Sequence, residues 1–122
     1  MRNPIIIAVL CAVVLAACGE TRPPVSEPPG PHLTVVAKDT RFDTAELAMV
    51  ANRATLIYFT NLDGEQHNIA IYPNKDSGDA LFVGELIGRG SVVYEVPPLA
   101  GGTYFFKCTV HPVMNGTVQV NP

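Results

Sequence analysis

Short runs in which apolar and polar residues alternate, separated by turn residues, fill the chain from residue 32 onward. In residues 55–61, Ile57 and Phe59 would lie on one face of a strand and Tyr58 on the other, because strand side chains alternate with a period of two. No run has the 3.6-residue period of an amphipathic helix. The predicted strands are 32–38, 46–50, 55–61, 67–72, 91–96, 103–108 and 117–120.

Turn residues separate these runs, including Asp63-Gly64 and Gly101-Gly102. Residues 80–87 fit either a short strand or a helical turn. The pattern therefore predicts an all-β domain of about seven or eight strands, arranged as a sandwich or a small barrel. The 10 glycines and 11 prolines agree with many turns.

The N-terminus has a different pattern. An apolar stretch, residues 4–17, follows Arg2; it is short for a membrane span but suits the core of a signal peptide. It ends in Leu15-Ala16-Ala17-Cys18-Gly19, which resembles the bacterial lipobox, where the cysteine becomes the lipidated first residue. We expect a lipoprotein signal peptide at 1–17 and an exported, membrane-anchored protein on the extracytoplasmic side, in the periplasm or at the cell surface. An ordinary signal peptide with a fortuitous Cys18 is the alternative.

Residues 18–31 are expected to form a lipid-anchored, proline-rich linker before a domain at 32–122. Five prolines lie between residues 19 and 31, where almost nothing is apolar. Such a segment favours an extended, semi-rigid spacer of roughly 3.1 Å per residue.

The net charge and the cysteine count limit the classes of function that the chain can have. The formal charge is −3, and no run of Lys or Arg is present, so a nucleic-acid partner is not expected. Cys11 lies in the predicted signal peptide and Cys18 would carry lipid, which leaves Cys108 without a disulfide partner. A single thiol in an oxidising compartment needs a chemical role or a buried position.

The most informative segment places Cys108, His111 and Met114 at C-x2-H-x2-M spacing. Pro112 and Gly116 argue against a helix, so a tight loop leaving a strand is predicted. Such a loop can direct three side chains at one point. Soft sulfur donors with imidazole select copper, zinc or iron–sulfur chemistry.

The number and type of donors disfavour two of these three, iron–sulfur clusters and structural zinc. Iron–sulfur clusters need more thiolates, and structural zinc sites commonly use several cysteines. One Cys, two His and a weak Met match a blue-copper set. The second histidine must come from elsewhere, and His67, followed by Asn68, is the candidate.

Residues 61–68 and 102–114 resemble the cupredoxins, or type 1 blue copper proteins, and the ligand loop is most similar to those of amicyanin- and plastocyanin-type proteins. The resemblance implies a Greek-key β-sandwich with one type 1 copper at one end. It implies hydrogen bonds from Asn68 and Thr109 around the cysteine sulfur. The implied copper ligands are His67, Cys108, His111 and Met114.

Two features qualify this resemblance. The related binuclear copper-A site needs two bridging cysteines, so Cys108 alone implies a mononuclear site. The compact spacing between His111 and Met114 leaves the axial geometry and the reduction potential open, and Met114 could instead fill core volume.

The leading function is a one-electron carrier and not an enzyme, because four protein ligands leave no open position for a substrate. Expected partners are unidentified redox proteins and, through the anchor, the membrane; the domain itself is expected to be a monomer. A copper storage or delivery module and a metal-free structural domain are the alternatives. His111, with Val110, Pro112 and Val113 around it, is the expected exit for the electron.

Residues outside the predicted site receive simpler interpretations. His32 is expected to be solvated, and Met49 is expected in the core. The acidic residues are scattered in sequence and are assigned to a solvated surface: Asp39, Asp43, Asp63, Glu65, Asp76 and Asp79.

Overall fold

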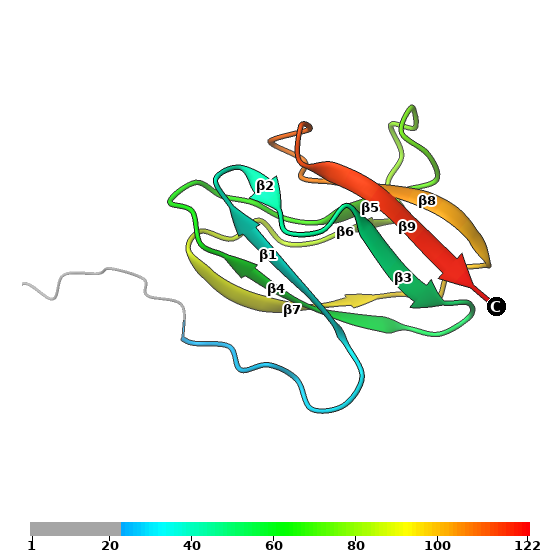
Figure 1. Ribbon diagram of the computed structural model, residues 1–122, viewed down its shortest axis with the longest axis horizontal. Helices are drawn as coiled ribbons and strands as arrows, with labels where there is room; N and C mark the ends of the chain where they lie inside the picture. The colour runs from blue at the N-terminus through cyan, green and yellow to red at the C-terminus, as the bar shows by residue number, and fades with distance from the viewer. Residues whose placement is uncertain (1–22) are drawn as a thin grey trace, which may run out of the picture.

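The computed structural model describes residues 23–122, which form two β-sheets packed face to face (Figure 1). One sheet has the strand order β2-β1-β4-β7 and the other β3-β9-β8-β5-β6. The predicted all-β sandwich is confirmed, and the two separate sheets exclude the barrel. The strands are β1 Leu33–Lys38, β2 Arg41–Phe42, β3 Glu46–Val50, β4 Thr55–Asn61, β5 Ala70–Tyr72, β6 Phe82–Val83, β7 Gly90–Val96, β8 Gly102–Lys107 and β9 Asn115–Asn121.

Nine strands are present in the described part of the chain, against about seven or eight predicted. The strand β2 was missed because it has two residues and follows a turn, Asp39-Thr40, that lacks glycine. The strand β6 lies inside the segment 80–87 and resolves that segment as β. The strand β5 begins at Ala70 and not at residue 67, so His67 precedes it and forms only an isolated bridge with Ile87.

Each sheet contains one parallel pair of strands. β1 pairs with β4 in one sheet and β3 with β9 in the other, whereas the remaining pairings are antiparallel. The turns before β5 and after β8 therefore lie at the same end of the sheet, because β5 and β8 are antiparallel neighbours. That end carries both segments that contain the predicted metal ligands.

Aromatic side chains fill the space between the sheets. Phe59 and Phe106 are fully buried, and Phe42 from the short β2 lies between them, with ring centroids 6.3 and 5.3 Å away. Burying one large apolar side chain contributes about 1.5–3 kcal/mol. Met49 is also buried, in agreement with its predicted core position.

Gly116, just after the C-terminal ligand loop, is closely packed. A Cβ at this position would contact the Ala45 carbonyl and lie 2.5 Å from the Phe106 ring. A larger residue would have to displace backbone, and Gly116 is therefore required by packing.

The described part of the predicted linker, residues 23–31, has no helix or strand and contacts the domain. The Tyr58 hydroxyl donates to the Val25 carbonyl at 3.1 Å. His32, expected to be solvated, instead bonds the Gly30 carbonyl and the Glu27 carboxylate, each at 2.8 Å, and these contacts raise the pKa of His32. The predicted signal peptide and Cys18 lie outside the described residues. Among the residues described, no helix is long and apolar enough to cross a membrane.

Candidate metal centre

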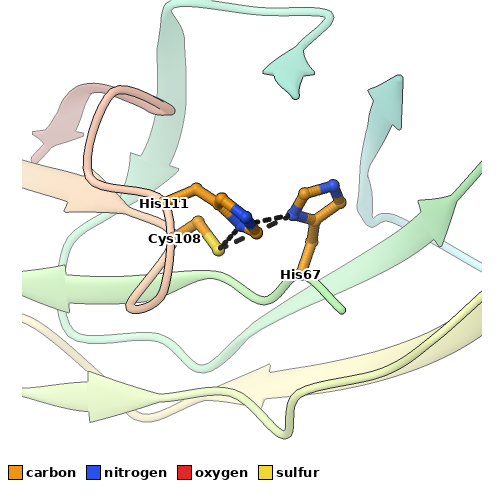
Figure 2. Close-up of side chains that lie close together, drawn as sticks. All are labelled: His67, Cys108 and His111. Carbon is orange, nitrogen blue, oxygen red and sulfur yellow. Dashed lines mark hydrogen bonds between the residues drawn. The ribbon is translucent and has the colours of Figure 1, made fainter. Parts of the chain in front are cut away.

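Three predicted donors meet at one end of the sandwich, although His67 is more than forty positions from the others in sequence. Figure 2 shows the His67 ring facing Cys108 and His111, which share one loop. The two Nδ1 atoms of His67 and His111 are 3.1 Å apart. The Cys108 Sγ atom is 3.9 Å from Nδ1 of His67 and 3.8 Å from Nδ1 of His111.

This triangle has the dimensions of a metal site. A point in its plane lies about 2.0 Å from both nitrogens and about 2.3 Å from the sulfur, which are the bond lengths that imidazole and thiolate form with a borderline metal ion. The two imidazoles and the thiolate therefore fit a trigonal His2Cys site, the arrangement of type 1 copper. Met114, the predicted axial donor, is buried at the end of the same loop.

The segment before β5 is ordered by the buried side chain of Asn61. Its amide nitrogen donates to the carbonyls of Glu65 and Ile87, at 2.7 and 2.9 Å, and its oxygen accepts the Asp63 N–H at 2.8 Å. The backbone of His67 also exchanges two 3.0 Å hydrogen bonds with Ile87. These bonds fix the backbone that carries the first histidine.

Asn68 joins the two ligand segments. Its Oδ1 accepts from the N–H of Thr109 at 2.9 Å and from the Thr109 hydroxyl at 3.2 Å. Its Nδ2 donates to the Gly84 carbonyl at 2.9 Å. Asn68 therefore links the residue after His67 to the residue after Cys108, as the cupredoxin resemblance implied.

The loop 108–114 is closed by its own backbone. The Cys108 N–H donates to the Met114 carbonyl at 3.0 Å, and the Met114 N–H donates to the His111 carbonyl at 2.9 Å. The Asn115 side chain donates to the Pro112 carbonyl at 2.9 Å. The predicted tight loop is present, and β8 ends one residue before Cys108.

Each histidine directs its second nitrogen at a carboxylate. His67 Nε2 lies 2.8 Å from Asp63 Oδ2, and His111 Nε2 lies 3.0 Å from Glu65 Oε2. Donation from the Thr40 N–H, then from His67 and the Asp39 N–H, lowers the pKa of Asp63 to about 2. The assignment of Asp63 to a solvated surface is therefore wrong: its side chain is 17% exposed and is occupied by hydrogen bonds within the protein.

The site is open to solvent on one side only. His67 and Cys108 are fully buried, whereas the His111 side chain is 27% exposed. Two apolar side chains of the same loop, Val110 and Val113, are exposed, and so is Leu62 in the segment before His67. The exposed surface at His111 therefore combines the Glu65 carboxylate at Nε2 with the apolar side chains of Val110 and Val113 from the same loop.

Two residues that shape the site had no role in the sequence interpretation. Asn61 and Asp63 lie inside the segment 61–68, and besides partners within that segment they bond Ile87 and the turn at Asp39-Thr40, which only the fold brings close. The one available signal was their position just before His67.

Comparison with known proteins agrees with this geometry. Residues 5–120 match the family model described as a cupredoxin-like domain. No curated protein sequence matches the chain.

Solved structures give the same picture of the fold. Amicyanin from Paracoccus versutus is 27% identical, with 78% of this chain and 86% of that chain covered and a TM-score of 0.60. Auracyanin from Roseiflexus castenholzii is 20% identical, covers 75% of this chain and 97% of its own, and has a TM-score of 0.65. Auracyanin B is 24% identical, with 80% and 94% covered and a TM-score of 0.67.

The donor arrangement matches a type 1 copper site, and copper is the cofactor that this site and the family imply. The predicted family is confirmed by the family model, which matches nearly the whole length, and the two-sheet sandwich agrees with it. The chain belongs to the cupredoxin-like domain family.

Proposed function

We propose that this protein carries single electrons on one type 1 copper ion held by His67, Cys108, His111 and Met114. The observation that supports it most is the triangle of two Nδ1 atoms and one Sγ atom, with sides of 3.1, 3.8 and 3.9 Å. The buried Met114 at the end of the loop adds the weak fourth donor.

When bound, copper supplies a Cu(II)/Cu(I) couple that exchanges one electron. The chain's own residues hold the donors still and keep water out. His67 and Cys108 are fully buried, and hydrogen bonds fix the backbone on both sides of each. With four protein ligands no position is left for a substrate, which supports a carrier and not an enzyme.

The exposed part of His111 is the proposed exit for the electron. Val110 and Val113, on the same loop, are exposed apolar side chains, and small apolar contact surfaces suit short-lived redox encounters. The proposed partners are redox proteins that meet a monomeric domain at this face.

The proposed location is the extracytoplasmic side of a membrane, with Cys18 as the acylated N-terminus. The support is the sequence Leu15 to Gly19, which resembles a lipobox and lies outside the described residues. Several acyl chains would give stable attachment. Replacing Cys18 by Ala should release a soluble protein or block processing, and mass spectrometry that finds an unmodified terminus at another residue would contradict the anchor.

Redox titration of the copper-loaded chain tests the proposed carrier. We expect one copper per chain and a reversible one-electron reduction, with the metal retained in both oxidation states against a competing chelator. If Cu(I) passes readily to the chelator while Cu(II) stays bound, the protein stores or delivers copper instead.

A further inference from the structure

Asp63 is positioned by three donors, two from the turn at Asp39-Thr40 and one from His67. Its Oδ1 atom accepts the Asp39 N–H at 2.8 Å, and its Oδ2 atom accepts the Thr40 N–H at 3.0 Å and lies 2.8 Å from His67 Nε2. A carboxylate accepts all three bonds, because its two oxygens offer about four acceptor sites. The side chain is 17% exposed, so little of it is left for water.

The turn that supplies two of these donors is strained. Asp39 and Thr40 have φ angles of 53° and 56° and connect β1 to β2 as a two-residue turn. Such turns favour Asn-Gly or Asp-Gly, and a β-branched threonine in this region is an outlier. Strain of this kind persists where the surroundings hold it in place. Here the Asp63 carboxylate accepts both N–H groups of the turn.

The remaining hydrogen bond of Asp63 has a chemical consequence. A carboxylate next to Nε2 favours the imidazole tautomer that carries its proton on Nε2. The lone pair of Nδ1 is then available to bind a metal ion. Nδ1 of His67 is the atom that faces Cys108 and His111.

We propose that Asp63 is a positioning residue of the metal centre: it fixes the His67 ring with Nδ1 toward the metal and places a negative charge behind it that favours Cu(II) over Cu(I). The inference rests on the proposed function and adds to it a residue that sets the reduction potential. The strained turn at Asp39 and Thr40 holds the carboxylate in place.

Glu65 provides an internal comparison. It stands behind the other histidine at a similar distance, 3.0 Å, but its side chain is 69% exposed. Water screens an exposed charge, and exposed pairs contribute little. The two carboxylates therefore differ in burial and anchoring more than in distance from a ligand.

The test is the reduction potential of the copper-loaded chain carrying Asp63→Asn, with Glu65→Gln as the matched control. Asp63→Asn should favour the reduced state by about tenfold or more, which is a rise of about 59 mV for a one-electron couple. Glu65→Gln should move the potential in the same direction by clearly less. An unchanged potential in Asp63→Asn, or an equal or larger shift in Glu65→Gln, would overturn the proposal.

A second pair of variants separates the charge from the support of the turn. An asparagine can accept only through its oxygen, so Asp63→Asn also weakens the turn. Thr40→Gly removes strain at a positive φ while keeping the N–H. Thr40→Gly alone should leave the potential unchanged. In the double variant it should restore stability but leave the potential raised; a potential that returns to the wild-type value would assign Asp63 a purely structural role and overturn the proposal.

Proton NMR of the diamagnetic Cu(I) form gives a readout that is independent of electron transfer. The Nε2–H of buried His67 should exchange slowly with solvent in the wild-type chain and faster in Asp63→Asn. Equal exchange rates would contradict the proposed hydrogen bond. Failure of the proposed function looks different, because the wild-type chain would then form no redox-active copper site at all.

Discussion

Residues 61–68 and residues 108–114 both deliver metal donors to the same point, but the two segments are built in different ways. In 61–68 buried side chains hold the backbone: Asn61 bonds two carbonyls, and Asp63 is anchored to the turn between β1 and β2. In 108–114 the loop closes on its own backbone, and its surface residues Val110 and Val113 are exposed.

The comparison suggests a division of roles between the two histidines. His67 is buried and attached to the body of the sandwich through Asp63 and Ile87, whereas His111 is partly exposed and its Nε2 faces the exposed Glu65. One segment thus fixes the geometry of the site, and the other presents the site to partners. The predictions below separate these roles.

Removing each histidine in turn should have unequal effects on the fold. His67→Ala leaves a cavity and takes the partner from Asp63, so the free energy of unfolding of the copper-free chain should fall by about 2–4 kcal/mol. His111→Ala removes a partly exposed ring and should cost less than about 1 kcal/mol. Denaturant unfolding measures both, and equal losses would contradict the division of roles.

Met114 tests whether the loop contributes to the electronic properties of the site as well as to its surface. Met114→Leu keeps the volume of this buried side chain but removes a weak donor to Cu(II). The blue colour should remain in part. The reduction potential should rise by about 59 mV, which corresponds to a tenfold change in the reduction equilibrium. An unchanged potential would assign Met114 to core packing alone.

The exposed apolar face is tested by adding charge where partners are expected to dock. Val110→Glu should slow electron self-exchange by at least tenfold, or about 1.4 kcal/mol, without changing colour or copper content. Val113→Glu should act in the same way. Val50→Glu is the control. Val50 is 49% exposed and Val110 is 50% exposed, but Val50 lies at the other end of the sandwich. Line broadening in mixed-valence samples gives the rates, and equal rates in the Val110 and Val50 variants would place the exit elsewhere.

Acid should weaken the 61–68 segment through Asp63. Because the pKa of Asp63 in the folded chain, about 2, lies below its ordinary value of 3.8, the carboxylate contributes stability that is fully present above about pH 4 and is lost as the pH falls through about 2. The stability difference between the copper-free wild type and Asp63→Asn should therefore shrink across that window. A difference that is constant from pH 5 to pH 2 would show that Asp63 has no such role.

The sequence predicted those parts of the fold and site that depend on local pattern. Alternation located most strands, and the spacing of Cys108, His111 and Met114 placed three candidate donors on one loop. His67 was selected by its neighbour Asn68 and by the cupredoxin resemblance. The structure brings the donor atoms of His67, Cys108 and His111 close together. It also buries Met114, which ends the loop that carries Cys108 and His111.

Features that depend on distant contacts could not be predicted. The turn at Asp39-Thr40 lacks the glycine that normally marks it, and so β2 was missed. Asp63 was assigned to the surface because the acidic residues are scattered in sequence, and its partner Asp39, 24 positions away, gave no local signal. Only the pairing of β1 with β4 brings that turn beside the segment 61–68.

The visible spectrum of the Cu(II)-loaded chain tests the central claim most directly. A thiolate in a trigonal site with two imidazoles should give one intensely blue copper per chain, and Cys108→Ser should abolish the colour. A wild-type chain that binds Cu(II) without the blue absorption, or a Cys108→Ser variant that remains blue, would contradict the assignment of a type 1 copper centre at His67, Cys108 and His111.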